Sequence, residues 1–238
     1  IITLLMNKES TFEKKLSIDD PRVQEIKNSW DQIILEISNK ISSETSVDSA
    51  YDLEKTTLEN LNLNKDKHGF LIISAPSGGG KGTIGKNIEK QGFEKLPRYT
   101  TRSPRPGEID GKDYYFISKK KFKEMDDEFF PFVETHGEFR ATSKKLLNKW
   151  TAENKKFYIE GSTEAYDDII ESPEVKNSNP LSIFLLPPSF EEHFKRLIQR
   201  PDNITSEEIL ERLNNATKHL KQTINSKYSG YIVNDNIN

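Results

Sequence analysis

The stretch SAPSGGGKGT, residues 74–83, decides the fold of this chain. Phosphate-binding loops are usually written G-x-x-x-x-G-K-[ST]. Gly80 and Lys81 fit that pattern, whereas Ala75 replaces the first glycine and Gly82 replaces the final Ser or Thr. The stretch is therefore a candidate phosphate loop with two exceptions, and its surroundings have to decide whether it functions.

An apolar run, FLIIS at residues 70–74, precedes this loop, and a helix is expected from about residue 82 to residue 91. Such short apolar runs are typical of buried parallel strands. In a strand–loop–helix unit, backbone N–H groups of the loop and of the helix N-terminus bind phosphate oxygens. The alternative is a glycine-rich turn with a chance lysine. The expected nucleotide contacts are Ala75, Pro76, Ser77, Gly78, Gly79, Gly80, Lys81, Gly82 and Thr83.

Neither exception rules out a working loop. Ala75 is tolerated if it ends the strand with a negative φ. Gly82 lacks the hydroxyl that often binds Mg²⁺, but Mg²⁺ commonly keeps several waters and binds through substrate phosphates. Thr83 is no automatic substitute, because it lies about 100° further round the helix. We expect Mg²⁺ to arrive with the nucleotide, and we assign no protein metal ligands.

The composition narrows the classes of protein that this chain can belong to. It has 238 residues, a net charge of −3 and no cysteine. The chain has no surplus of positive charge that would favour nucleic acid or anionic lipid as a partner. No apolar run approaches the roughly 18 residues of a membrane span. We expect a cytoplasmic protein that binds neither nucleic acid nor membrane.

Residues 1–67 differ from the rest, and we expect a helical or flexible extension there, dispensable for chemistry. Asp20 and Pro21 form a helix-start signal. Apolar residues then recur every three or four positions, as in an amphipathic helix. This helix either packs on its own domain or mediates self-association or partner binding, and the polar residues 42–68 predict a linker with one short helix. The apolar stripe consists of Val23, Ile26, Trp30, Ile33, Ile37 and Ile41.

Residues 68–238 alternate between predicted strands and helices, which indicates an α/β sheet. Expected strands cover residues 113–118, 129–134, 156–160, 182–186 and 231–235, besides the run before the loop. Expected helices cover residues 119–125, 141–150, 189–200 and 206–222. The four histidines show no metal-ligand spacing, so we interpret them as structural or surface residues: His68, His136, His193 and His219.

A second anion site is indicated by RYTTRSPRPGEIDGKDYYF, residues 98–116. Arg98, Arg102 and Arg105 lie close together, and Tyr114 follows a turn. Each guanidinium can fork onto oxyanion oxygens, so clustered arginines suit a phosphate. Ordinary surface charge is the alternative interpretation.

These motifs together resemble guanylate kinase, a family of P-loop nucleoside-monophosphate kinases. The resemblance rests on SAPSGGGKGT followed by TTRSPRPGEIDGKDYYFIS, and it extends through IFLLPPSFEEHFKRLIQR and YIVNDNIN. It covers roughly residues 69–238. It implies a P-loop NTPase-type parallel sheet flanked by helices, a small GMP-binding lobe and an arginine-bearing lid. GKGT in place of GKST resembles variants in guanylate and adenylate kinases.

The resemblance also implies roles for individual residues. The acceptor GMP is expected to contact Arg98, Arg102, Arg105, Tyr114, Glu134, Arg140, Thr142 and Glu160, of which Glu134 and Glu160 resemble the carboxylates that face guanine. Lid and hinge arginines that close on the triphosphate correspond to Arg196, Arg200 and Arg212, which with Lys81 are the expected catalytic residues. Asn234 corresponds to an asparagine near the adenine of ATP.

Several positions depart from the family's pattern. Arg98 stands where a serine is usual, and Arg140 replaces a phosphate-binding tyrosine. The chain is three residues shorter after Glu134, and Ser162 replaces an acidic residue. Residues 200–201 read Arg-Pro in place of Arg-Gly, and the family's final helix is not expected before residue 238. These departures leave the expected phosphate-binding residues in place. They affect the residues expected to position the guanine base and to bind the metal ion.

The sequence thus predicts an ATP-dependent kinase that converts GMP and dGMP to the diphosphates. Guanylate-kinase-like domains also serve as peptide-binding scaffolds, typically with a degraded loop, and this is the alternative function. A related kinase with a shifted base preference is the third.

Overall fold

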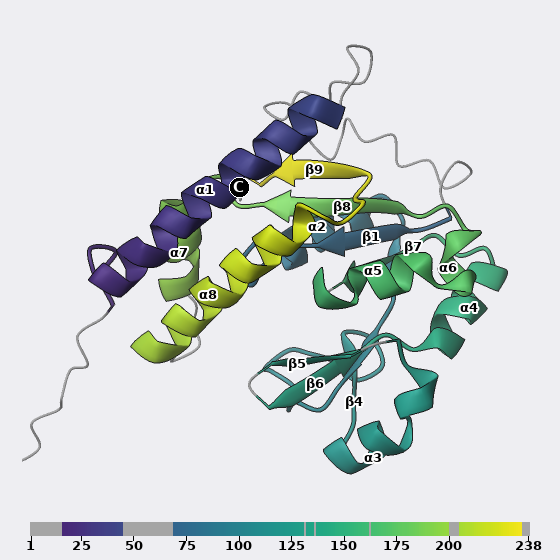
Figure 1. Ribbon diagram of the computed structural model, residues 1–238. Helices are drawn as coiled ribbons and strands as arrows, with labels where there is room; N and C mark the ends of the chain where they lie inside the picture. The colour runs from purple at the N-terminus through teal and green to yellow at the C-terminus, as the bar shows by residue number, and fades with distance from the viewer. Residues whose placement is uncertain are drawn as a thin grey trace, which may run out of the picture.

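The computed structural model describes residues 16–44, 69–130, 132–135, 137–161, 163–199 and 205–234. Its central sheet is parallel throughout and has five strands in the order β2-β7-β1-β8-β9 (Figure 1). The strands are β2 (Glu94–Lys95), β7 (Phe157–Gly161), β1 (Leu71–Ser74), β8 (Leu181–Leu186) and β9 (Gly230–Val233). The structure therefore confirms the predicted parallel sheet.

Helices flank this sheet because its strands carry apolar side chains on both faces. Along β1, Ile72 packs in a cluster with Tyr166 of α5, while Leu71 and Ile73 pack in a second cluster with Ile84 of α2. Alternation of this kind places successive strand side chains in different layers. The flanking helices are α2 (Lys81–Lys90), α4 (Lys144–Ala152), α5 (Thr163–Glu171), α6 (Pro173–Lys176), α7 (Phe190–Ile198) and α8 (Ser206–Thr223).

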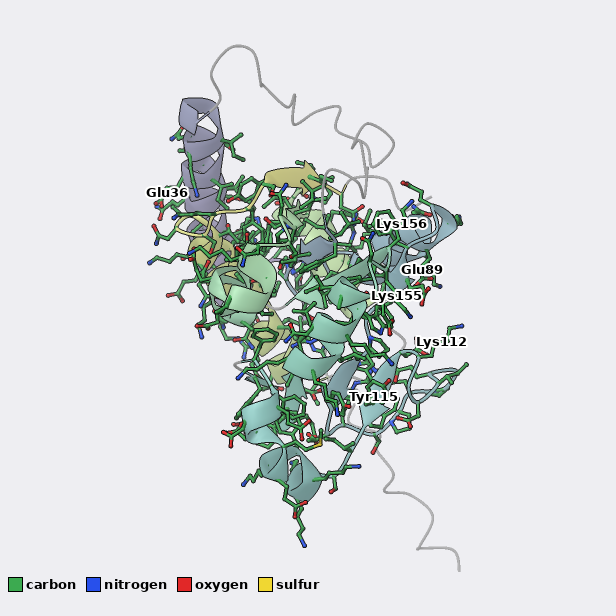
Figure 2. All side chains as sticks on the ribbon, turned by 90° about the vertical axis from the view of Figure 1, so that its right-hand side faces the viewer. Glu36, Glu89, Lys112, Tyr115, Lys155 and Lys156 are labelled. Carbon is green, nitrogen blue, oxygen red and sulfur yellow. The ribbon has the colours of Figure 1, made fainter. Side chains whose placement is uncertain are left out.

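A second, four-stranded sheet forms a separate lobe in the order β4-β3-β6-β5. Phe122 and Phe129 pack on one face of it together with Ala141. Its strands are β3 (Arg98–Thr100), β4 (Tyr114–Phe116), β5 (Val133–Thr135) and β6 (Glu138–Ala141), and it carries α3 (Lys119–Glu124) and a 3₁₀ turn (Asp126–Glu128). Figure 2 places Tyr115 in this lobe, away from Glu89, Lys155 and Lys156 near the central sheet.

Several predicted boundaries need correction. Strands β2, β3 and β6 were not expected, and α5 and α6 follow a strand where no helix was predicted. The helix expected at residues 141–150 begins at Lys144, because Ala141 belongs to β6 and the Ser143 hydroxyl caps the helix by accepting from the Leu146 N–H at 3.2 Å. Of the run 129–134, only residues from Val133 onward are in a strand.

The helix predicted in the N-terminal segment is α1 (Pro21–Glu44). Its apolar stripe is buried in one cluster with side chains of α7, α8 and β8, and Figure 1 shows α1 lying along α8. The helix therefore packs on its own domain, and the stripe is covered rather than open to a partner. The linker predicted at residues 42–68 lies largely outside the described residues, as do His68 and His136. None of the described helices has both the length and the apolar character to cross a membrane.

Replacing Ile37 by alanine tests whether α1 shares the core. Ile37 is 1% exposed, so the Ile37→Ala change should lower the free energy of unfolding by about 2–5 kcal/mol. Leu35, on the same helix, is 62% exposed, and Leu35→Ala should change it by about 0.5 kcal/mol or less. Denaturant unfolding followed by circular dichroism measures both. Equal effects of the two changes would show that α1 is not part of the core.

Candidate functional site

The glycine-rich loop joins the end of β1 to the start of α2. Gly78 and Gly80 take φ values of 82° and 92°, a left-handed region that residues with a side chain rarely adopt. Gly80 is also closely packed, because a Cβ there would lie 2.0 Å from Nδ2 of Asn234. Ala75 is not among the described residues with positive φ, as expected for the end of a strand. The loop therefore has the conformation that a phosphate loop requires.

Lys81 is the first residue of α2, where the positive end of the helix dipole lies. Its Nζ donates hydrogen bonds to the backbone carbonyls of Ala75 and Pro76, so the ammonium group lies over the loop. The N-terminus of a helix with a lysine folded over it is an arrangement that attracts phosphate oxygens.

Asn234 braces the loop from the end of β9. The side-chain Nδ2 of Asn234 donates to the Gly79 carbonyl at 3.0 Å. The backbone carbonyl of Asn234 accepts from Nη2 of Arg196 at 2.9 Å. Arg196 also pairs with Glu192 at 3.1 Å, while its Nη1 is buried without a hydrogen-bond partner among the described residues. Asn234 and Arg196, predicted as nucleotide contacts, are thus brought together at the loop.

Arg102 is held on the lobe in a defined direction. Both its Nη atoms donate to Glu108, at 2.7 Å and 2.5 Å, and the guanidinium lies 5.0 Å from the ring centroid of Tyr114. The hydrogen bonds that Arg102 donates to Glu108 raise the pKa of Arg102, against a smaller opposing effect of burial. The Arg105 backbone N–H also donates to Glu108, at 2.7 Å. Glu108 therefore organises the arginine loop.

Arg140 is where the predicted cations converge. Strand alternation and register place it on the same face of the lobe sheet as Arg98 and Tyr114. Burial lowers the pKa of the Arg140 guanidinium; Tyr114 opposes this, and repulsion from the cations Arg102, Arg105 and Arg212 adds to it. Arg212 comes from α8, so the lobe and the central domain both contribute charge. Arg200 lies outside the described residues.

Arg98 occupies a different position from the other arginines. It is buried, and it donates to the backbone carbonyl of Glu160 at 3.1 Å and to that of Arg140 at 3.4 Å. It therefore links the central sheet to the lobe. The Glu160 side chain pairs with Lys95 at 3.1 Å, and the Lys95 ammonium lies 5.3 Å from the Tyr114 ring centroid.

The two expected base contacts on the lobe differ in placement. Thr142 is buried, and its hydroxyl has no hydrogen-bond partner among the described residues. Glu134 is exposed and pairs across β5 and β6 with Phe139, so it shares a face with Phe139 rather than with Arg140. Thr135 pairs with Glu138, which leaves two residues in the connecting turn. With this short turn, the pairing of β5 and β6 puts Glu134 on the opposite face of the lobe sheet from Arg140.

Two residues at this site were missed in the sequence analysis. Lys95 belongs to β2, a two-residue strand with no apolar signal. Glu108 stands inside the arginine-rich stretch, where its position three residues after Arg105 could have marked it as their partner. In the described part of the chain, no group of three or more His, Asp or Glu side chains lies close enough to hold a metal ion.

The parallel sheet, the strand–loop–helix unit and the loop lysine define a P-loop nucleotide-binding protein. Comparison with known proteins narrows the class further. The family model described as guanylate kinase matches residues 67–238. A guanylate kinase of Clostridium perfringens (strain ATCC 13124) is 36% identical over 180 residues, covering 74% of this chain and 80% of that protein. One from Caldanaerobacter subterraneus subsp. tengcongensis is 39% identical over 178 residues, covering 72% and 82%.

A solved structure agrees at the level of the fold. The crystal structure of guanylate kinase from Anaplasma phagocytophilum has a TM-score of 0.55 and 23% identity, covering 71% of this chain and 79% of that one. The chain belongs to the guanylate kinase family, and it is a nucleoside-monophosphate kinase.

Two glycines of the loop should respond oppositely to the same substitution. A Cβ at Gly82 meets nothing within 4 Å, so Gly82→Ala should keep nucleotide binding and stabilise α2 by about 0.5–1 kcal/mol. Gly80→Ala should lose nucleotide binding, because its φ of 92° and the contact with Asn234 exclude a side chain. Thermal unfolding and nucleotide titration of both variants measure this. Equal tolerance at both positions would contradict the loop geometry.

Proposed function

We propose that this protein transfers the γ-phosphoryl group of ATP to GMP and dGMP, which gives ADP and the corresponding diphosphate. The observation that carries the proposal is the cationic face of the lobe sheet, where Arg140 and Tyr114 share a face, Arg102 lies against the Tyr114 ring, and Arg212 of α8 adds positive charge. Like charges that lie close together in a partly buried site repel one another, and an anion between them offsets that repulsion. A phosphate-bearing acceptor is an anion of this kind.

Phosphoryl transfer requires positioning and charge stabilisation more than covalent chemistry by the protein. The glycine loop and Lys81 bind the β- and γ-phosphates of ATP. Arg102, Arg140 and Tyr114 hold the acceptor phosphate in line, with Arg105 contributing charge. An oxygen of that phosphate then bonds to the γ-phosphorus as the bond to the bridging oxygen of ADP breaks. Mg²⁺ bound to ATP supplies further neutralisation of the phosphates.

Arginines of α7 and α8 complete the site. Arg196 is tied to the loop through Asn234, and its buried Nη1 is available to a phosphate oxygen. Arg212 reaches the same cationic cluster from α8. Both guanidinium groups then neutralise charge on the transferred group, and the proposal extends this role to Arg200. Asn234 contacts ATP through its position at the loop, and the adenine is its expected neighbour.

For the base, we propose that Glu160 and Thr142 are the main contacts. Guanine presents N1–H and the 2-amino group as neighbouring donors, and an ionised carboxylate can accept both. Lys95 holds the Glu160 carboxylate in place at 3.1 Å. The buried Thr142 hydroxyl can donate or accept. Glu134, which faces away from Arg140, has the weaker support. We further propose a cytoplasmic protein without nucleic-acid or membrane partners, which the net charge of −3 supports.

The loop lysine gives the direct test of phosphoryl transfer. Lys81→Ala should lower kcat for GDP formation by at least about 10²-fold, because charge at the transferred phosphoryl group loses its partner. Lys86 is an exposed lysine five residues further along α2, so Lys86→Ala should leave kcat unchanged and serves as the control. A coupled ADP-release assay measures both. Binding of ATP and GMP by the wild-type chain with no GDP formed would favour the peptide-binding alternative.

The acceptor series tests the base assignment. We expect turnover in the order GMP, dGMP, then IMP, which lacks the 2-amino group, with AMP and UMP negligible. Sites that hydrogen-bond a polar substrate group can discriminate by about 10⁴-fold. Glu160→Gln should narrow the preference for GMP over IMP more than the matched Glu134→Gln change does. A larger effect at Glu134 would show that the base lies on the other face of the lobe sheet, and rapid AMP turnover would exclude guanine specificity.

A further inference from the structure

Helix α1 lies outside residues 67–238, which match the guanylate kinase family, yet it is buried against the helices that carry Arg196 and Arg212. Its contact with α7 centres on Trp30, which is 1% exposed. The indole ring lies edge-on to Phe190 with centroids 5.6 Å apart. It lies at a tilt of 32° over the ring of His193, with centroids 4.9 Å apart. The extension therefore has a direct packing contact with α7.

His193 continues this contact to the nucleotide loop. Its side chain is fully buried. A Cβ on Gly78 would lie 3.4 Å from Cε1 of His193 and 3.0 Å from Cδ2 of Leu197, so both α7 side chains lie directly behind that glycine. Trp30, His193 and Gly78 thus form a continuous packed series from α1 to the loop. Close-packed interiors transmit displacements, because no void absorbs them.

The same helix reaches the loop at a second point. Arg196 donates to the Asn234 carbonyl, and Asn234 donates to the Gly79 carbonyl. Helix α7 therefore supports both Gly78 and Gly79. Helix α1 in turn covers α7, and Lys27 pairs with Glu191 of α7 at 3.1 Å. A change in the position of α7 would reach two neighbouring residues of the loop at once.

The buried imidazole acts as a neutral spacer. Burial lowers the pKa of His193 to about 3, and the nearby charges of Arg196 and Lys81 contribute. Neither ring nitrogen has a hydrogen-bond partner among the described residues. A buried polar group without a partner costs about 1–3 kcal/mol. Packing contacts, the tilted one with Trp30 among them, therefore hold this ring in place of hydrogen bonds among the described residues.

We propose that Trp30 is a positioning residue for the nucleotide loop, acting through His193 on Gly78, so that α1 belongs to the catalytic unit. The proposal rests on the proposed use of ATP at this loop. It replaces the expectation that residues 1–67 are dispensable for chemistry. Trp30 touches no substrate; it sets the position of the loop and thereby the affinity for ATP.

Kinetics of full-length variants give the first test. Trp30→Leu should raise KM for ATP about tenfold. A displacement of the loop by about 1 Å would cost on the order of 10²-fold in rate, and a smaller displacement costs less. KM for GMP should change by less than about twofold, because the lobe is not displaced. Trp30→Phe, which keeps an aromatic face for His193, should recover most of the loss.

Ile37→Ala is the matched control for stability. It removes a buried side chain of the same helix and cluster, seven residues and about 10 Å further along the axis. It should leave KM for ATP unchanged in the folded enzyme. If Ile37→Ala raises KM for ATP as much as Trp30→Leu does, the effect is general destabilisation and the proposal fails.

Fluorescence gives a readout that does not depend on turnover. The chain has two tryptophans, so Trp150→Phe leaves Trp30 as the single emitter. Titration with ATP should change the Trp30 emission with the same midpoint as ATP binding measured by calorimetry. ATP binding with unchanged emission would overturn the role of Trp30 and leave the kinase function standing. Absence of ATP binding in calorimetry would overturn the proposed function and, with it, this inference.

Discussion

The structure depends on the absence of a side chain at Gly80. The Asn234 amide occupies the place where a Cβ would be, and from there it holds the Gly79 carbonyl. This single contact joins the first strand of the sheet, where the loop begins, to β9 at its edge, 155 residues away in sequence. It also brings Arg196 to the loop. The glycine thus determines more than the conformation of its own turn.

The site has two kinds of arginine, which differ in their partners. Arg102 has a carboxylate partner, so its direction is fixed while its charge is partly offset by Glu108. Arg140 has no carboxylate among the causes that shift its pKa; burial and the cations Arg102, Arg105 and Arg212 lower that pKa. An arginine cannot reproduce the geometry of a tyrosine hydroxyl, but it adds a charge that tyrosine lacks. In the proposed acceptor site, the exchange at position 140 therefore favours charge over hydroxyl geometry.

The sequence predicted those parts of the fold that local patterns determine. Apolar runs located β1, β7, β8 and β9, and spacing located α1, α7 and α8. Strands β2, β3 and β6 are short and partly polar, and they form because a neighbouring strand is present, which no local pattern reveals. The direction of Glu134 depends on strand register, and a shift of one residue reverses it. The apolar stripe of α1 predicted a buried face. Which helices cover that face depends on tertiary packing, and the sequence pattern does not contain it.

Arg98 has a mechanical consequence. Its guanidinium binds one carbonyl of the central sheet, at Glu160, and one of the lobe, at Arg140. Hydrogen bonds from a charged donor contribute about 1.5–3 kcal/mol, more than those between neutral groups. Because Arg98 belongs to β3 of the lobe, its bond to Glu160 is the one that crosses to the central sheet, and sliding of the lobe along that sheet would break it. Arg98 is in this sense a tether between the lobe and the central sheet, and it opposes any displacement that carries β3 away from the Glu160 carbonyl.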